Sequence, residues 1–277
     1  MSFSIEGKTA IVTGAANGVG LAIARQFVAQ GANVMFADMD EEALEREVAD
    51  AAEVAGAPTD GEEARARAFC GDLRQRLDQA NLLSATLDAY ERVDILVNGS
   101  RQMAPSDPLD ADSDQVATLW EQNVLTSLRM SQLVAKRMIR TSEEEGNEAT
   151  YVGSIINLSS IAARRTHPEL MGYSVTTAAL DQLTRSLAVA LAPHRIRVNA
   201  VAFGSVMSES LKGALKENTE FRADIREHTP MNRIARAAEV AEAVQFLASG
   251  AAAFMTGQII TVDGGRTLLD PVTAPAH

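Results

Sequence analysis

The chain has 277 residues, of which 37 are acidic and 25 basic, so its formal net charge is −12. Hydrophobic residues make up 46% and charged residues 22%, which fits a globular protein with a sizeable core and excludes a disordered or fibrous chain. Because the negative charge repels phosphates, we expect no nucleic-acid partner and no anionic membrane surface as a partner. Ten acids and one base lie between Asp40 and Glu63, a net charge of −9, which we interpret mainly as a solvated helix face and loop.

Targeting, disulfide and metal signals are not visible in the sequence. No basic region followed by an apolar run opens the chain, and no apolar stretch approaches the roughly 18 residues of a membrane span, so a cytoplasmic location is predicted. The single cysteine, Cys70, forms no internal disulfide, and its Ala-Phe-Cys context predicts a small buried thiol. The four histidines lack metal-ligand spacing, so no metal site is expected.

Short apolar strands alternate with helical stretches along the whole chain. Strands are predicted at 8–13, 33–37, 67–70, 93–98, 154–158, 196–202 and 258–262. Helices are predicted at 21–30, 40–55, 73–90, 113–140 and 173–191, with a loop at 56–63 and a polar segment at 141–150. This alternation favours an α/β fold, a doubly wound parallel sheet with helices on both faces and ligands at the carboxyl ends of the strands.

Domain organisation follows from the same alternation. It runs from end to end, so residues 1–277 are predicted to form one nucleotide-binding domain. The polar helical segment at about 205–236 interrupts the pattern and is expected to project over the ligand crevice as a lid.

A glycine-rich turn, TGAANGVG at 13–20, follows the first strand. Its glycines allow a tight turn in which a pyrophosphate lies against the N–H groups that open a helix, although an ordinary strand-to-helix turn has the same composition. Asp38 ends the second strand, where a carboxylate accepts ribose hydroxyls and repels a 2′-phosphate. The alternative role for Asp38 is a helix cap, for which Asp40 is better placed. These features predict a cofactor that contains a pyrophosphate and an adenosine ribose without a 2′-phosphate; with the resemblance described next, this cofactor is NAD.

Further motifs share these positions with a known family. With the glycine turn and Asp38, they are Asp72, Asn123, INLSS at 156–160, Tyr173, RVNA at 197–200 and VDGG at 262–265. Over about residues 5–266 the chain resembles the classical short-chain dehydrogenase/reductase family. The resemblance implies a Rossmann-type, mainly parallel seven-stranded sheet, a nicotinamide cofactor and hydride transfer between a secondary alcohol and a carbonyl in a small-molecule substrate.

The resemblance also implies residue roles and an assembly. Tyr173 would be the acid/base, Ser160 would hydrogen-bond the substrate oxygen, and Asn123 would hold a proton-relay water. Cofactor contacts are implied for Gly14, Asn17, Gly18, Val19, Gly20, Asp38, Asp72, Leu73, Asn98, Thr177, Gly204, Val206 and Ser208, with Asp72 and Leu73 at the adenine. A homodimer or homotetramer is implied, packed through the apolar surfaces of the helices at 113–140 and 173–191.

The chain departs from the family where the chemistry would take place. The family's Tyr-x-x-x-Lys is YSVTT at 173–177, so Thr177 replaces the lysine that holds the nicotinamide ribose and whose charge helps ionise the tyrosine. A free phenol has a pKa near 10, so losing that cation would cost on the order of 10²–10³ in rate. The expected Asn-Asn-Ala-Gly is NGSR at 98–101, and the expected Pro-Gly is Phe203–Gly204.

Three functions are compatible with these departures. The first is an NAD(H)-dependent oxidoreductase with a rebuilt site, in which Arg101 supplies the missing cation and Thr177 keeps a ribose hydrogen bond. The second is a catalytically impaired NAD-binding protein that serves as a sensor or as a subunit of a hetero-oligomer. The third is a scaffold without cofactor, which the glycine turn and Asp38 disfavour. Arg164 and Arg165 either attract an acidic substrate or are a solvated loop pair.

Overall fold

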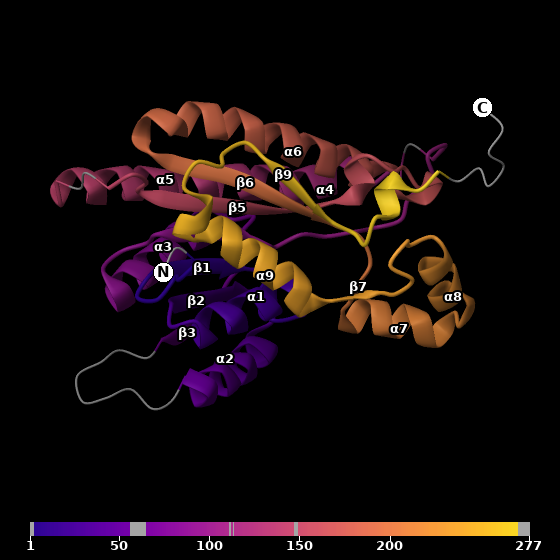
Figure 1. Cartoon of the computed structure of the whole chain (residues 1–277), viewed down its shortest axis with the longest axis horizontal. Coiled ribbons are helices and arrows are strands. Elements are labelled where there is room, and N and C mark those ends of the chain that lie inside the picture. Colours follow the sequence, from indigo (N-terminus) through magenta and orange to yellow (C-terminus); the bar gives the residue numbers. More distant parts are fainter. Residues whose placement is uncertain (1–2, 56–64, 111, 113, 147–148, 271–277) are drawn as a thin grey trace.

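The computed structural model describes residues 3–55, 65–110, 112, 114–146 and 149–270. Its centre is a seven-stranded sheet with the strand order β3-β2-β1-β4-β5-β6-β9 (Figure 1). The strands are β1 (Thr9–Thr13), β2 (Asn33–Asp38), β3 (Ala66–Cys70), β4 (Ile95–Asn98), β5 (Gly153–Ser160), β6 (Ile196–Phe203) and β9 (Ile259–Val262). Every neighbouring pair is parallel. The predicted Rossmann-type fold is confirmed, and the sheet is wholly parallel.

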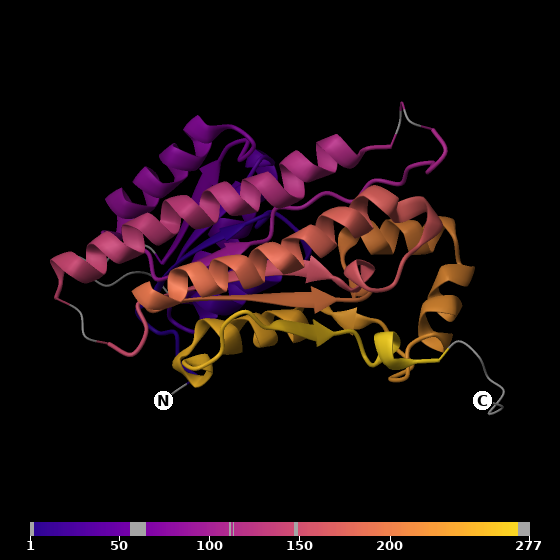
Figure 2. The ribbon, with the colours of Figure 1, turned by 90° about the horizontal axis from the view of Figure 1, so that it is seen from above.

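Helices cover both faces of the sheet (Figures 1 and 2). One layer contains α1 (Gly18–Ala29), α2 (Glu41–Ala55) and α9 (Ala237–Ala248), and the other contains α3 (Arg76–Tyr90), α5 (Thr126–Glu144) and α6 (Met171–Leu191). Successive strand residues alternate between the two layers: Val12 joins the α1 and α9 cluster, whereas Ile11 joins the α3 and α5 cluster. Burial on both faces explains why the strands are almost entirely apolar.

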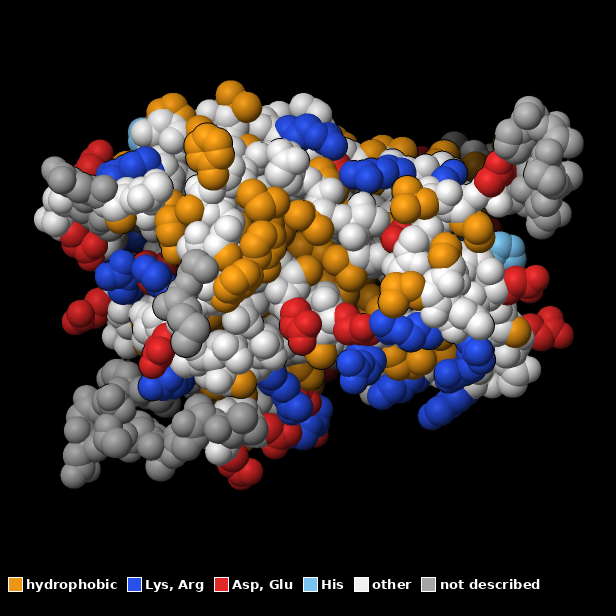
Figure 3. Space-filling view, in the orientation of Figure 1, with side chains coloured by type: hydrophobic (Ala, Val, Ile, Leu, Met, Phe, Trp, Pro, Cys, Tyr) orange, Lys and Arg blue, Asp and Glu red, His pale blue; other side chains and the backbone are white. Residues whose placement is uncertain are grey.

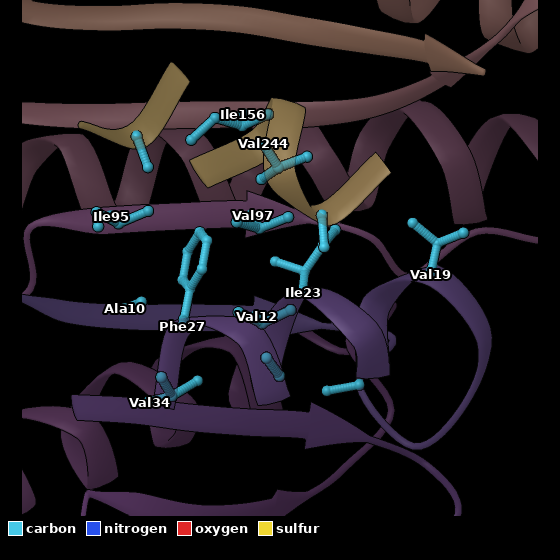
Figure 4. Close-up of a cluster of buried hydrophobic side chains, with 14 of the residues drawn as sticks. Ala10, Val12, Val19, Ile23, Phe27, Val34, Ile95, Val97, Ile156 and Val244 are labelled. Carbon is cyan, nitrogen blue, oxygen red and sulfur yellow. The ribbon is translucent and has the colours of Figure 1, made fainter. Parts of the chain in front are cut away.

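The core between the sheet, α1 and α9 offers a test of the packing. Figure 4 shows Ile23 and Phe27 of α1 close to Val12, Val97 and Val244. Ile23 is fully buried. We expect Ile23→Val to lower the free energy of unfolding by about 0.5–1.5 kcal/mol, because one buried methylene is lost.

Urea denaturation followed by circular dichroism measures this loss. The control is Leu77→Ala, since Leu77 of α3 is 70% exposed and its truncation should change stability by less than about 0.5 kcal/mol. Equal effects of the two substitutions would contradict the packing of α1 on the sheet.

Two helix starts differ from the sequence prediction by three residues. Helix α1 begins at Gly18, three residues early, because the last residues of the glycine turn are already helical. Helix α3 begins at Arg76, three residues late, because Gln75 N donates to Asp72 O (2.8 Å) in a turn that precedes it. The predicted loop at 56–63 and the predicted helix start at Ser113 lie outside the described residues.

The prediction of one regular helix over 113–140 is wrong. The structure has a short α4 (Val116–Leu119), a π-helical turn at Trp120–Leu125, and then α5, which continues to Glu144 through the start of the predicted polar segment. In this wider turn Thr126 N donates to Glu121 O, the carbonyl five residues earlier. The Thr126 hydroxyl also donates to Glu121 O (3.0 Å), and the Ser127 hydroxyl donates to Asn123 O (3.0 Å).

The prediction that Cys70 is buried is also wrong: Cys70 is exposed at the end of β3. β3 is an edge strand in which only Ala66 is fully buried, so its residues are not enclosed as those of the central strands are. The thiol lies 3.6 Å from Met39 O.

Residues 205–236 form an appendage on the sheet. It contains β7 (Val206–Met207), α7 (Glu209–Glu217), α8 (Glu220–Glu227) and β8 (Ala235–Arg236), and β7 pairs in parallel with β8. Figures 1 and 2 show it at the end of the molecule toward which β6 and β9 point. Lys and Arg side chains gather over β7 and α7 in Figure 3. Within the described part of the chain, no helix is both long and apolar enough to cross a membrane.

Candidate active site

The carboxyl ends of all seven parallel strands meet along one edge of the sheet, and the strand order reverses between β1 and β4. Ligands of such sheets bind in the crevice at this reversal. β1 there leads into the glycine turn, β2 ends in Asp38, β4 leads to Arg101, and β5 ends in Ser160.

The glycine turn is shaped by the close approach of two chain segments. Gly14 has a φ of +70°, and a side-chain carbon there would lie 2.7 Å from Gly99 O. A side-chain carbon on Gly20 would collide with the carbonyl of Gly14. Both positions therefore require glycine.

Helix α1 begins directly after this turn. Its N-cap, Asn17, makes no side-chain cap bond, and its first turn, which includes Gly18, Val19 and Gly20, contains no acidic residue. The N–H groups at the helix start are therefore not claimed by a carboxylate, which fits an anionic pyrophosphate.

Asp38 lies beside this turn, whereas Asp40 belongs to a helix. Asp38 Oδ2 accepts from Ala16 N (3.0 Å) and its Oδ1 accepts from Met39 N (2.7 Å). Asp40 Oδ1 accepts from Ala43 N (3.1 Å), so Asp40 caps α2 as the sequence suggested. Asp38 is half-buried and keeps acceptor capacity for ribose hydroxyls.

The predicted adenine contacts are already engaged within the chain. The carboxylate of Asp72 accepts from Arg74 Nε (2.9 Å) and Arg74 Nη2 (2.8 Å). These hydrogen bonds from Arg74 hold the pKa of Asp72 below its usual value. Leu73 is buried in the core, so adenine contact with either residue stays a prediction.

Asn98, predicted to contact the cofactor, uses its amide inside the protein. Asn98 Nδ2 donates to Asn157 Oδ1 (2.8 Å) and to Ser131 Oγ (3.0 Å), which links β4 to β5 and α5. Beyond it, Gly99 N and Ser100 N each donate to Thr13 Oγ1 at 3.0 Å. This anchoring of the segment after β4 to the end of β1 sets the position of Arg101.

Arg101 contacts the predicted acid/base directly. Its Nη1 donates to Tyr173 Oη (2.5 Å), and its guanidinium carbon lies 4.2 Å from the centre of the Phe203 ring. Tyr173 is 4% exposed and lies in the first turn of α6. Phe203 stands where the family has proline, and sequence reasoning noted that departure without recognising the ring as a platform for Arg101.

Ser160 lies next to this cluster. It ends β5 in register with Phe203 of β6, and its Oγ accepts from Ala162 N (3.2 Å). Buried hydrogen bonds hold β5 against α6, one of them from Ser159 Oγ to Asp181 Oδ1 (2.6 Å). Burial raises the pKa of Asp181. The strand that carries Ser160 is therefore fixed against the helix that carries Tyr173.

Asn123 lies in the π-helical turn and binds the segment after β4. Its Nδ2 donates to Gln102 O (2.9 Å), and its Oδ1 accepts from Gln102 N (2.8 Å). Asn123 Nδ2 also lies 3.3 Å from Thr176 Oγ1. Sequence reasoning missed this clamp on the residue that follows Arg101. The proposed relay water stays a prediction.

Thr177 does not replace the missing lysine. Its hydroxyl donates to Tyr173 O (2.8 Å), the carbonyl one helical turn earlier, and the residue is 2% exposed. The Thr177 hydroxyl oxygen can therefore still accept a hydrogen bond from a ribose hydroxyl, but its proton is already used.

The remaining predicted residues lie between β6 and the appendage. Gly204 N donates to Val262 O (3.2 Å), Val206 is buried in β7, and Ser208 Oγ accepts from Leu211 N (3.2 Å) and caps α7. Arg164 donates to Thr261 Oγ1 (3.3 Å) and Arg165 to the carbonyl of Thr267, so both side chains bond to the chain's C-terminal part.

Comparisons with known proteins agree with this geometry. Residues 14–267 match the family model described as enoyl-(acyl carrier protein) reductase. The 7alpha-hydroxysteroid dehydrogenase of Escherichia coli is 31% identical over 261 residues, 94% of each chain. The cis-4-hydroxycyclohexanecarboxylate dehydrogenase of Sinomonas cyclohexanicum is 35% identical over 260 residues, covering 94% of this chain and 96% of the relative.

Solved structures show the same relationship. A 7alpha-hydroxysteroid dehydrogenase complexed with NADH and 7-oxo glycochenodeoxycholic acid superposes with a TM-score of 0.83 at 29% identity and covers 95% of this chain and 96% of its own. A short-chain type dehydrogenase/reductase from Mycobacterium marinum has a TM-score of 0.81 at 27% identity and covers 96% and 97%. The chain belongs to the classical short-chain dehydrogenase/reductase family, whose members are oxidoreductases that interconvert alcohols and carbonyls.

Proposed function

We propose that the protein is an NAD(H)-dependent oxidoreductase that interconverts a secondary alcohol and a carbonyl, in which Arg101 takes the place of the missing lysine. The observation that carries this proposal is the hydrogen bond from Arg101 Nη1 to Tyr173 Oη. A guanidinium can only donate hydrogen bonds, so in this contact the phenol oxygen is the acceptor. The phenol's own proton is then free for the oxygen of a carbonyl substrate.

The residues have separable roles. Bound NAD(H) would supply the hydride acceptor or donor, held by the glycine turn, the start of α1 and Asp38. Tyr173 donates its proton to the carbonyl oxygen in reduction and takes a proton from the alcohol in oxidation. Ser160 donates a hydrogen bond to the same oxygen as charge develops. The positive charge of Arg101 stabilises the phenolate that remains.

The substrate class is suggested by the relatives. One is named for a hydroxysteroid and another for a hydroxycyclohexanecarboxylate, both ring-bound secondary alcohols. The test follows NADH formation with NAD and cyclohexanol, cis-4-hydroxycyclohexanecarboxylate or a 7α-hydroxy bile acid. We expect turnover of at least one alcohol.

A second candidate is an NAD-binding protein without efficient turnover, a sensor or a hetero-oligomer subunit. It is favoured by Thr177, whose hydroxyl proton goes to its own helix. NADH binding without turnover of any of these alcohols would support it. Binding of NADH is measured by fluorescence and by thermal shift. If millimolar NADH did not bind, both candidates would be overturned.

Cofactor choice gives a further prediction. Asp38 stands where a 2′-phosphate would meet a carboxylate, and α2 begins with Glu41 and Glu42. We expect NADH to bind at least about tenfold more tightly than NADPH, or roughly 1.4 kcal/mol. Fluorescence titration with both cofactors measures the ratio.

The same titration on two variants locates the cause. Asp38→Ala should remove most of the discrimination, whereas Asp40→Ala, which removes an equal charge two residues away, should keep it. Equal affinity of the wild-type protein for both cofactors would contradict the prediction.

Assembly and location stay predictions. Exposed apolar side chains on the α4-to-α6 side support a subunit interface: Trp120 is 40%, Val175 47% and Val189 78% exposed. Light scattering tests the proposed homodimer or homotetramer.

A further inference from the structure

A cavity with polar groups in its walls lies next to the segments that form the proposed site. It has a volume of about 570 Å³ and lies between the segment after β4 and the turn before α6. Its walls contain three prolines, a hydroxyl, an amide and two carboxylates, contributed by Pro105, Ser106, Asp107, Pro108, Gln115, Pro168 and Glu169. Ser106 N donates to Glu169 O (2.9 Å), which holds the two walls together.

The two segments that line the cavity continue into the segments that carry Arg101 and Tyr173. The segment after β4 contacts Tyr173 through Arg101, then Asn123 through Gln102, and then Glu169 through Ser106. Glu169 precedes Tyr173 by four residues, about one helical turn. Side chains on a helix lean toward its N-terminus, and the lining residues Pro168 and Glu169 lie in the turn that precedes the N-terminus of α6. A substrate whose oxygen reaches Tyr173 can therefore extend into the cavity.

The cavity contains polar groups that the chain leaves unused. Ser106 is only 8% exposed, yet its Oγ has no hydrogen-bond partner within the described residues. A buried hydroxyl without a partner in the chain is costly, so Ser106 Oγ is available to a ligand that enters the cavity. The Glu169 carboxylate forms no ion pair in the same part of the chain, and Asp107 uses one oxygen, Oδ1, for Leu109 N (2.9 Å).

These groups select the chemistry of the ligand. Two carboxylates and a free hydroxyl oxygen attract a positively charged hydrogen-bond donor, and prolines suit the carbons attached to it. A metal ion fits poorly, because the described residues contain no group of three or more His, Cys, Asp or Glu that could hold one. Within the described residues, Arg164 and Arg165 form no ion pair with either carboxylate; they donate to Thr261 Oγ1 and to Thr267 O.

We propose that this cavity is a subsite for an alkylammonium group on the substrate, bound by Glu169, Asp107 and Ser106. The proposal rests on the proposed function, because it names the substrate class of the same site: an amino-substituted secondary alcohol or its ketone. Such amines are protonated near neutral pH.

Matched ring alcohols test the subsite. The probes are cyclohexanol and its cis-4-amino, cis-4-methyl and cis-4-carboxylate derivatives, assayed with NAD. We expect kcat/KM of the amino compound to exceed that of the methyl compound at least tenfold. Glu169→Gln should remove most of this preference while leaving cyclohexanol unaffected, and Glu143→Gln on exposed α5 should preserve it. Ser106→Ala should lower the preference without lowering Tm, since no hydrogen bond of the chain is lost.

Two outcomes overturn the subsite: a preference for the methyl or carboxylate compound, or an amino preference that survives Glu169→Gln. The assays also separate failure of the subsite from failure of the proposed function. If the proposed function is wrong, neither cyclohexanol nor any of the other alcohols reacts. In that case binding of cyclohexylammonium alone, measured by calorimetry on the wild-type protein and Glu169→Gln, decides the subsite. Binding that weakens at least tenfold in the variant supports it, and equal or absent binding overturns it.

Discussion

Tyr173→Phe is expected to lower kcat by about 10³-fold while NADH still binds. The phenol is the only proton donor that the proposed chemistry places on the substrate oxygen, and removing a positioned acid/base typically costs 10²–10⁴ in rate. Stopped-flow or steady-state assays of NADH formation measure kcat, and fluorescence titration measures binding. Because the ring stays, packing in the first turn of α6 is preserved.

Tyr151→Phe is the matched control. The Tyr151 ring lies 5.0 Å from the guanidinium of Arg197, away from the site, so the loss of its hydroxyl should leave kcat unchanged. If Tyr173→Phe retained most of the wild-type rate, another group would be moving the proton.

Arg101→Met is expected to lower kcat about 10²-fold, because the developing phenolate loses its charged donor. A change confined to KM would mean that Arg101 binds substrate instead. Methionine keeps an apolar chain over Phe203, so the loss is one of charge. The control is Arg140→Met, which removes a guanidinium that pairs with Glu144 in the last turn of α5 and should leave kcat unchanged.

A double variant tests the same idea in the other direction. Arg101→Gly with Thr177→Lys restores the family's residues at both positions. We expect kcat of this double variant to be at least tenfold higher than kcat of Arg101→Met. An unchanged rate in Arg101→Met would by itself show that Arg101 does not replace the lysine. A loss in Arg101→Met without recovery in the double variant would show that the two cations are not interchangeable.

The fold followed closely from the sequence because it depends on repeated local signals. Apolar strands alternating with amphipathic helices predict a doubly wound sheet wherever the individual boundaries fall. The exposure of Cys70 could not be predicted in this way. It depends on the position of β3 at the edge of the sheet, which the local sequence pattern does not encode. The extension of α5 to Glu144 was missed because an exposed final turn has the composition of a loop.

The site could be predicted only in part. Motif positions singled out Tyr173, Asp38 and Arg101, since each follows a strand or lies at a fixed spacing. The Phe203 platform joins Arg101, after β4, to the end of β6, which lies far along the chain. The clamp joins Gln102 to Asn123 in the π-helical turn 21 residues later, and both contacts form only in the folded protein. Thr177 is different: a hydroxyl that bonds to the preceding helical turn is a local effect.

The π-helical turn at Trp120–Leu125 makes the site sensitive to chain length as well as to chemistry. Such a turn amounts to one additional residue in an α-helix, which changes the phase of the helix by about 100°. Deleting a single residue there would restore a regular helix and rotate Asn123 away from Gln102, the neighbour of Arg101. Deleting Glu121, about twenty positions from Arg101, would thus act on the proposed cation, although every predicted catalytic and cofactor-binding residue remained encoded.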